Sequence, residues 1–165
     1  TALNFFTIKK EFHNVINKYE NIDGLFDIMG GISPLLNCSI KKKYYFDTSN
    51  NFKNAAKRLN PKIITLKKIP KIKNYLIFIN KDFFNLKLNK MNYNLLKEVA
   101  FNNTLYVYSY KHDHKEELIF LKRNRGLYNQ IEVSKNFKYF SNFMHMGFKT
   151  IKTKNLELIK LKPNY

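Results

Sequence analysis

The residues best suited to chemistry in this sequence form the pentapeptide KRNRG at residues 122–126. It holds Arg123 and Arg125, two of the three arginines among 30 Lys and Arg residues. A guanidinium grips a phosphate with a planar fork of donors and stacks on bases, which an ammonium cannot do. Gly126 permits a positive φ and a close approach of the backbone to a ligand. The pentapeptide is therefore a candidate RNA-binding loop, and the alternative is a solvated hairpin end.

The net charge of +18 on 165 residues also favours a polyanionic partner, because a compact body with that charge repels itself. The cations gather in two segments. Residues 48–81 carry nine cations and no acid, and residues 122–162 carry ten cations and two acids. Two separate basic surfaces suit a folded RNA held at more than one place better than a single duplex groove.

Signals for catalysis or metal binding are weak. His112 and His114 flank an aspartate in a polar turn, but no cysteine or third ligand follows at a recognisable spacing. Gly30 and Gly31 lack the remainder of any glycine-rich fingerprint, and no nucleophile elbow is present. A nuclease would need acidic metal ligands beside its basic groove, which the acid-free segment does not offer. We therefore expect no enzyme activity, no metal and no cofactor.

Cysteine content and codon bias bear on the compartment. The single cysteine, Cys38, excludes an internal disulfide and fits a reducing compartment. The most apolar run, residues 24–36, is broken by Asp27 and Pro34 and is too short to span a bilayer. The first residues show neither a signal peptide nor an import peptide. A composition rich in Lys, Asn, Phe and Tyr but poor in Arg, Gly and Pro indicates AT-rich codons. We expect an organelle-encoded protein of the mitochondrial matrix.

The first half of the chain predicts the element order α-β-α-β-β. Ile8, Phe12, Val15, Ile16 and Tyr19 recur at helical spacing. The expected elements are a helix over 7–20, an irregular segment over 21–40, a strand over 43–48, a helix from a Thr48 or Ser49 cap to Leu59, and strands near 62–67 and 74–80.

The second half predicts mostly strands. The pattern leaves 83–91 open, and 92–100 fits a helix or an extended segment. The other expected elements are paired strands at 104–110 and 117–123, a helix around Phe137, Phe140 and Phe143, and two strands within 147–162. The fold class is then α+β with two small lobes. Residues 1–82 form the N-terminal lobe, with 21–40 a probable insertion, and residues 83–165 form a mainly β, rRNA-binding lobe with a short helix and a divergent C-terminal extension.

This order, followed by a second lobe, resembles the universal small-subunit ribosomal protein family conventionally numbered eight, in a divergent mitochondrial form. The resemblance is carried by five stretches: FDTSNNFKNAAKRLNPKII (46–64), NYLIFINK (74–81), LLKEV (95–99), LYVY (105–108) and LIFLKRNRGLY (118–128). The chain departs from the family in having FNNT (101–104) where a Ser-Lys-Pro-Gly turn is usual. It also lacks a Gly-Gly-Glu segment near the C-terminus.

The resemblance implies a function and a set of RNA-binding residues. It implies a structural constituent of the mitochondrial small ribosomal subunit that binds the central domain of the rRNA and neighbouring ribosomal proteins, with no membrane and no small-molecule substrate. The family's hydroxyl-rich loop corresponds to Lys122, Arg123 and Asn124, followed by Arg125 and Gly126. The other implied contacts are Ser49 at a helix start, Lys53, and the polar side of the first helix with Lys9, Lys10, His13 and Asn14.

Several features have simpler interpretations. Ser49 can cap a helix without any RNA. Tyr106, Tyr108 and Tyr110 share one face of a predicted strand and would either stack on bases or pack in the core. The alternative functions are another mitoribosomal protein, a basic matrix-side subunit of a respiratory complex, or a nucleic-acid enzyme.

Overall fold

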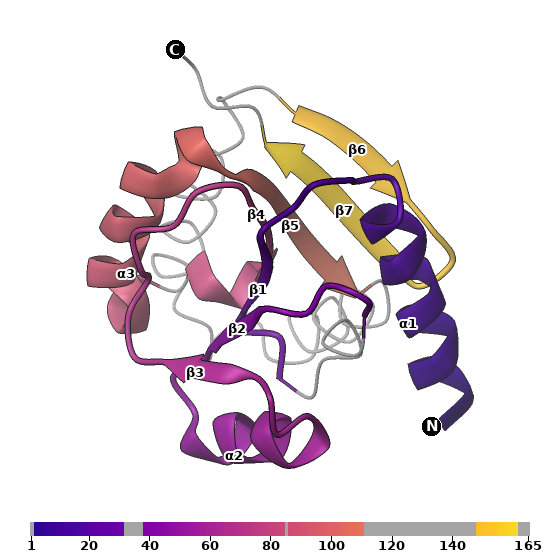
Figure 1. Cartoon of the computed structure of the whole chain (residues 1–165), viewed down its shortest axis with the longest axis horizontal. Coiled ribbons are helices and arrows are strands. Elements are labelled where there is room, and N and C mark those ends of the chain that lie inside the picture. Colours follow the sequence, from indigo (N-terminus) through magenta and orange to yellow (C-terminus); the bar gives the residue numbers. More distant parts are fainter. Residues whose placement is uncertain (1, 32–37, 85, 111–147, 162–165) are drawn as a thin grey trace, which may run out of the picture.

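One seven-stranded sheet organises the molecule, with the strand order β3-β2-β1-β4-β5-β7-β6 (Figure 1). The computed structural model describes residues 2–31, 38–84, 86–110 and 148–161. The first five strands of that order are parallel, and β7 runs antiparallel to both β5 and β6. The sheet is therefore a doubly wound α/β sheet with a reversed hairpin at one end.

The described elements follow one another along the chain in a fixed order, with the helices α2 and α3 lying between pairs of strands. They are α1 (Ala2–Ile16), β1 (Gly24–Ile28), β2 (Lys43–Phe46), α2 (Asn50–Leu59), β3 (Ile64–Leu66), β4 (Tyr75–Asn80), the 3₁₀ turn η2 (Lys81–Phe84), α3 (Leu86–Val99), the 3₁₀ turn η3 (Ala100–Asn102), β5 (Thr104–Tyr110), β6 (Phe148–Lys152) and β7 (Leu156–Leu161). No helix in the described ranges is long and apolar enough to cross a membrane.

The chain reverses its direction of winding between β1 and β4. It runs outward from β1 to β2 and β3, and it then crosses back to lay β4 on the other side of β1. Asp27 on β1 pairs with Tyr45 on one side and with Phe78 on the other. Ligands of open α/β sheets bind at the carboxyl ends of the strands where this reversal occurs.

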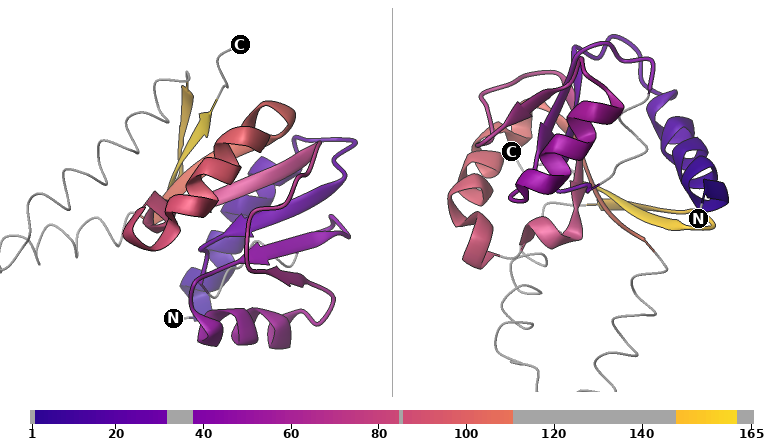
Figure 2. Two further views of the ribbon diagram at one scale, coloured as in Figure 1. Left: turned by 90° about the vertical axis from the view of Figure 1, so that its left-hand side faces the viewer. Right: turned by 90° about the horizontal axis from the view of Figure 1, so that it is seen from below.

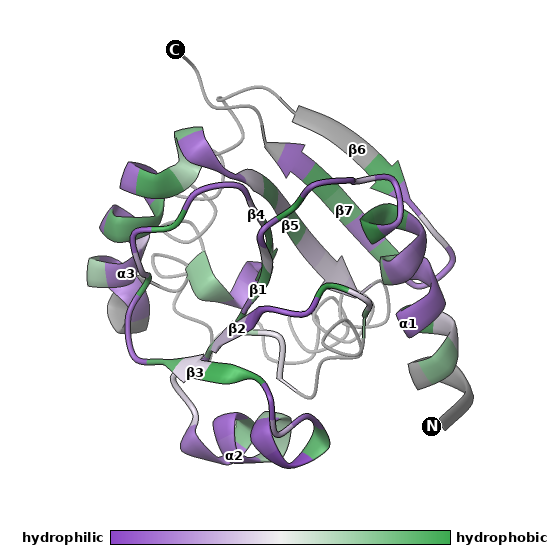
Figure 3. Cartoon of the chain, viewed as in Figure 1, coloured by the Kyte–Doolittle hydropathy of each residue, from purple (hydrophilic) through white to green (hydrophobic). Residues whose placement is uncertain are grey.

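One face of the sheet is covered by α1 and α2. Seen from below, α1 and α3 lie on opposite sides of the strands (Figure 2). Phe12 of α1 is fully buried and meets the rings of Phe78 and Tyr108 edge-on. Ala56 of α2 belongs to the same cluster, whereas the rest of α2 is mostly hydrophilic (Figure 3). Helix α1 buries Phe12, Val15 and Ile16 against the sheet, as an amphipathic helix does. Helix α2 buries Ala56 but leaves Phe52 and Leu59 exposed.

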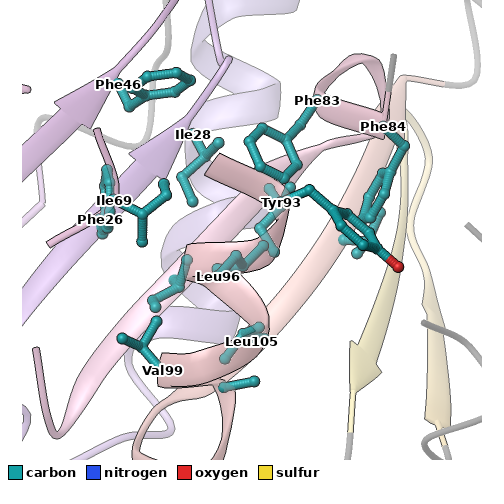
Figure 4. Close-up of a cluster of buried hydrophobic side chains, with 14 of the residues drawn as sticks. Phe26, Ile28, Phe46, Ile69, Phe83, Phe84, Tyr93, Leu96, Val99 and Leu105 are labelled. Atoms are coloured by element: carbon teal, nitrogen blue, oxygen red, sulfur yellow. The ribbon is translucent and has the colours of Figure 1, made fainter. Parts of the chain in front are cut away.

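The other face is covered by η2 and α3. The aromatic rings of Phe83 and Phe84 pack against each other and, through Phe46 and Tyr93, join β2 to α3 (Figure 4). Leu96 of α3 is fully buried in this cluster. The central strands are therefore buried on both faces, as parallel strands usually are.

The start and the end of α2 follow from local sequence. Ser49 has an extended backbone, and its hydroxyl accepts from the amide of Phe52 at 3.4 Å, as an N-cap does. Asn60 closes the last turn by donating its amide to the carbonyl of Ala56, and Pro61 follows. The predicted helix from the Ser49 cap to Leu59 is confirmed.

The predicted two-lobe α+β fold is wrong. Strand β4 belongs to the expected first lobe and β5 to the second, but they are hydrogen-bonded parallel neighbours in one sheet, so no boundary falls at residue 82. The expected insertion over 21–40 contains β1, a central strand with all five residues buried. The Gly, Ser and Pro residues of this segment predict an irregular structure. The run LFDI shows no alternation that would predict a strand, because both its faces are covered.

The strands of the second half are confirmed in part. Residues 104–110 form β5, and 147–162 contain β6 and β7, as predicted. Residues 86–99 form a helix, so the helical alternative for 92–100 is correct. The predicted pairing of 104–110 with 117–123 is wrong, because β4 and β7 occupy the two edges of β5. Residues 117–123 themselves lie outside the described residues.

Candidate active site at the carboxyl edge of the sheet

Two aspartates stand at the carboxyl ends of the adjacent parallel strands β1 and β2. Asp27 is 0% exposed and Asp47 is 4% exposed. They come from segments twenty residues apart, and the parallel register that pairs Asp27 with Tyr45 brings them to the same edge. Buried carboxylates are costly unless hydrogen bonds or a cationic or donor-rich ligand offset the lost hydration. Their surroundings therefore decide what this edge can bind.

Asp47 is held in place by two donors. Its Oδ1 accepts from the backbone N–H of Ser49 at 2.9 Å, and its Oδ2 accepts from the hydroxyl of Tyr45 at 2.8 Å. A carboxylate offers about four lone-pair directions. Two further donors, such as the hydroxyls of a vicinal diol, therefore find acceptors on a side chain that is already oriented.

The loop after β1 is shaped by glycine at two positions. A Cβ on Gly30 would overlap the carboxylate of Asp27. The carboxylate can therefore lie this close to the backbone only because residue 30 has no side chain. Gly31 has a φ of +64°, in the left-handed region that favours glycine. Its carbonyl accepts from the Tyr45 hydroxyl at 2.9 Å. The loop is thereby attached to the end of β2.

The end of β4 completes the polar cluster. Asn80 is buried, and its Oδ1 accepts from the amide of Asp82 at 3.0 Å. The hydroxyl of Tyr108 on β5 donates to Oδ1 of Asp27 at 3.4 Å and also bonds the side chain of Asn80. Burial, followed by the charge of Asp27, raises the pKa of Tyr108, so this hydroxyl stays protonated. Among the described residues no group of three or more His, Cys, Asp or Glu side chains could hold a metal ion.

The predicted RNA-binding residues of the first helix lie on α1, which packs on the face of the sheet that holds Phe78 and Tyr108. Lys10 and Asn14 are exposed on α1, and Lys9 and His13 are half-buried. Burial, then the charges of Lys9 and Lys43, lower the pKa of His13, so it is neutral at pH 7 and adds no attraction for phosphate. In Figure 1, α1 lies beside β7, whereas α2 lies beside β3.

Of the other predicted RNA contacts, some lie in the described part of the chain and the rest lie outside it. Ser49 caps α2 and its amide binds Asp47, so it does stand at the candidate site; Lys53 lies one turn further along α2. Lys122, Arg123, Asn124, Arg125 and Gly126 lie outside the described residues, as do His112 and His114. As RNA contacts all of these stay predictions. Tyr106 and Tyr108 are buried, which supports the packing interpretation of their strand face.

The two aspartates are not among the site residues predicted from the sequence. Asp27 was noted only because it interrupts an apolar run, and Asp47 only because it bounds the acid-free segment. The available signal was that each directly follows or ends a short apolar strand, in LFDI and KYYFD. An acid at that place in two successive strands indicates an α/β ligand edge.

Solved structures with this architecture were found by comparison, although no family model and no curated protein matches the sequence. A putative S-adenosyl-L-methionine-dependent methyltransferase from Methanococcus maripaludis gives a TM-score of 0.59 at 16% identity, covering 96% of this chain and 86% of its own. A protein from Pyrococcus horikoshii gives 0.60 at 11% identity, covering 97% and 91%. The plantazolicin methyltransferase in complex with SAH gives 0.54 at 13% identity, covering 98% and 84%. The chain has the fold of the S-adenosylmethionine-dependent methyltransferases.

This similarity corrects the family and the function expected from sequence. The resemblance to the small-subunit ribosomal protein family is wrong, because the observed sheet is that of the methyltransferases. The predicted structural role in the mitochondrial ribosome, with rRNA and ribosomal proteins as partners and no small-molecule substrate, is therefore wrong as well. The same holds for the expectation that the chain is not an enzyme. The α-β-α-β-β order that carries the resemblance omits β1, and the observed order at the start of the chain is α1-β1-β2-α2-β3-β4.

Proposed function

We propose that this chain binds S-adenosylmethionine at the carboxyl ends of β1 and β2 and transfers its methyl group to an acceptor. The observation that carries the proposal is Asp47. It is an oriented, nearly buried carboxylate at the end of the second strand, beside the point where the sheet reverses its winding. An acid at this place in doubly wound folds accepts from the ribose hydroxyls of an adenosine.

The loop after β1 favours an adenosine ligand without phosphate. Dinucleotide sites need a G-x-G-x-x-G turn leading into a helix whose N-terminus holds the pyrophosphate. Here Met29-Gly30-Gly31 is followed by Ile32-Ser33-Pro34, which lacks that spacing. Gly30 is needed for the packing of Asp27 rather than for a phosphate. S-adenosylmethionine has a ribose and an adenine but no phosphate, so it fits the donors and acceptors present.

The reversed hairpin is a second supporting observation. A dinucleotide-binding sheet ends in a further parallel strand beyond β5. In this chain β7 enters antiparallel between β5 and β6. The similar protein from M. maripaludis and the N-methyltransferase NodS from Bradyrhizobium japonicum, with a TM-score of 0.55 at 8% identity, are both described as methyltransferases.

In the proposed reaction the main task of the protein is to position the methyl donor and the acceptor. Bound S-adenosylmethionine supplies an electrophilic methyl carbon: a lone pair of the acceptor attacks it, and the carbon–sulfur bond breaks with its electrons left on sulfur. Holding two reactants in line removes much of the entropic barrier to such a displacement. Asp47 would fix the ribose, and the loop at Gly30 and Gly31 would set the depth at which the ligand lies.

Binding of S-adenosylhomocysteine, measured by calorimetry, tests the proposal. The Asp47→Asn variant keeps the size of the side chain but removes the charge. Since a hydrogen bond to a charged group contributes about 1.5–3 kcal/mol, the affinity should fall about tenfold to a hundredfold. Asp23→Asn is the matched control, because Asp23 is exposed and precedes the opposite, amino end of β1.

The outcomes separate clearly. Binding by the wild type that Asp47→Asn weakens and Asp23→Asn leaves unchanged supports the site. Equal loss in both variants would mean that only the net charge matters. A wild-type chain that does not bind S-adenosylhomocysteine would contradict the proposed function.

A further inference from the structure

We propose that Tyr45 is a positioning residue that fixes Asp47 and the loop after β1 as one unit. The inference rests on the proposed function and concerns how this chain prepares the site. The Tyr45 hydroxyl lies 2.8 Å from Oδ2 of Asp47 and 2.9 Å from the carbonyl oxygen of Gly31. One buried oxygen atom thus joins the ends of two strands that carry the site.

The ring of Tyr45 cannot easily move away from these partners. The residue is 0% exposed and lies in the cluster beneath α1 and α2. In the parallel register it stands opposite Asp27, so its backbone is fixed by pairing with β1. A donor fixed by packing loses little conformational freedom when it binds, which is how a preorganised site gains affinity.

The hydroxyl of Tyr45 is protonated at neutral pH and acts as a donor. Burial, and then the charges of Asp27 and Asp47, raise the pKa of Tyr45 well above its usual range. A hydroxyl has one proton. The proton is shared between the carboxylate of Asp47 and the carbonyl of Gly31, so a change at one partner alters the hydrogen bond to the other. Asp47 therefore presents its remaining lone pairs in one orientation, which selects the paired hydroxyls of a ribose.

The test measures discrimination between two ligands rather than affinity alone. The probes are S-adenosylhomocysteine and its 2′-deoxy analogue, bound to the wild type and to Tyr45→Phe. The wild type should prefer the ribose form by about tenfold, the effect of one charge-assisted hydrogen bond. In Tyr45→Phe the preference should fall to about twofold, because a carboxylate that is no longer held in the right orientation makes a weaker hydrogen bond to the ribose.

Tyr106→Phe is the matched control. Tyr106 lies on the same face of the sheet, is buried, and bonds the hydroxyl of Tyr19 rather than any site residue. It should lose stability as Tyr45→Phe does but keep the full preference for the ribose form. If Tyr45 had a purely structural role, both variants would keep the preference for the ribose form. That result would overturn the inference.

Two further readouts keep the inference testable if Tyr45→Phe is unstable. In the Asp47→Asn background, Tyr45→Phe should change ligand affinity much less than it does in the wild type. In the wild type, the NMR signal of the Tyr45 hydroxyl proton should move when S-adenosylhomocysteine binds, and that of Tyr106 should not. An unmoved Tyr45 signal in a chain that binds the ligand contradicts the inference alone. Absence of binding by the wild type contradicts the proposed function and the inference together.

Discussion

Gly30 and Gly31 are adjacent, yet they are glycines for different reasons. At Gly30 the space of a side chain is taken by the carboxylate of Asp27. At Gly31 a Cβ would meet the ring of Phe52 only at ordinary contact distance, but the backbone is left-handed. Gly30→Ala should cost about 1–3 kcal/mol of unfolding free energy through overpacking. Gly31→Ala should cost about 1–2 kcal/mol through backbone strain.

Substitution by asparagine separates the two causes in urea unfolding. Asparagine tolerates the left-handed region, so Gly31→Asn should recover part of the stability lost in Gly31→Ala. Gly30→Asn should be less stable than Gly30→Ala, because its side chain is larger. The reverse order at either position would contradict the assignment of these roles.

At the scale of elements, α1 is attached to the turn between β6 and β7 by one carboxylate. Oε1 of Glu11 accepts from the amide of Asn155 at 2.9 Å, and Oε2 accepts from its side-chain amide at 3.1 Å. Burial alone would raise the pKa of Glu11, but hydrogen bonds from Thr153, Asn155 and Lys154 outweigh it and lower the pKa. The first helix and the last hairpin are thereby joined by an ionised group.

The attachment should depend on pH in a defined direction. Because the folded pKa lies below the usual value of 4.5, the carboxylate contributes stability above that value and loses it as the pH falls through the folded pKa. The melting temperature of the wild type should exceed that of Glu11→Gln at pH 7, and the difference should shrink below about pH 4.5. Glu20→Gln, at an exposed position after α1, should show no such convergence.

How far the sequence predicts these elements depends on how local their signals are. Helix α2 was predicted closely because its cap, Ser49, and its stop, Asn60-Pro61, lie within its own segment. Strand β1 was missed because a strand buried on both faces shows no alternation. The site was missed for a further reason: Asp27 and Asp47 meet only through the parallel pairing of β1 with β2, which no local pattern reveals.

At the scale of the whole molecule, the net charge of +18 opposes the compact state. The acid-free segment 48–81 contains α2, the edge strand β3, the loop to β4 and β4 itself (Figure 1), so its cations flank β3 in the sequence. Lysines at an edge strand also discourage pairing with another chain. Strand β3 pairs with β2 on one side, and the lysines that flank it in the sequence disfavour pairing of its outer edge with another chain.

Screening that repulsion should stabilise the fold. Raising NaCl from about 20 mM to about 300 mM shortens the Debye length from roughly 20 Å to below 10 Å, and the melting temperature should rise by several degrees. Sucrose at matched osmolality serves as the uncharged control. A melting temperature that does not change with salt would show that the cations are too far apart to repel each other appreciably.

The place of β7 sets an order of events during synthesis. Phe12 of α1 is buried in one cluster with Leu156 and Leu158 of β7, and Glu11 binds the turn that precedes them. Phe12 also meets Phe78 of β4 and Tyr108 of β5, so the apolar stripe of α1 can be covered in part before β7 is made. Domains generally fold as they are translated. Docking of α1 would then begin on the central strands and be completed when the hairpin of β6 and β7 joins the sheet.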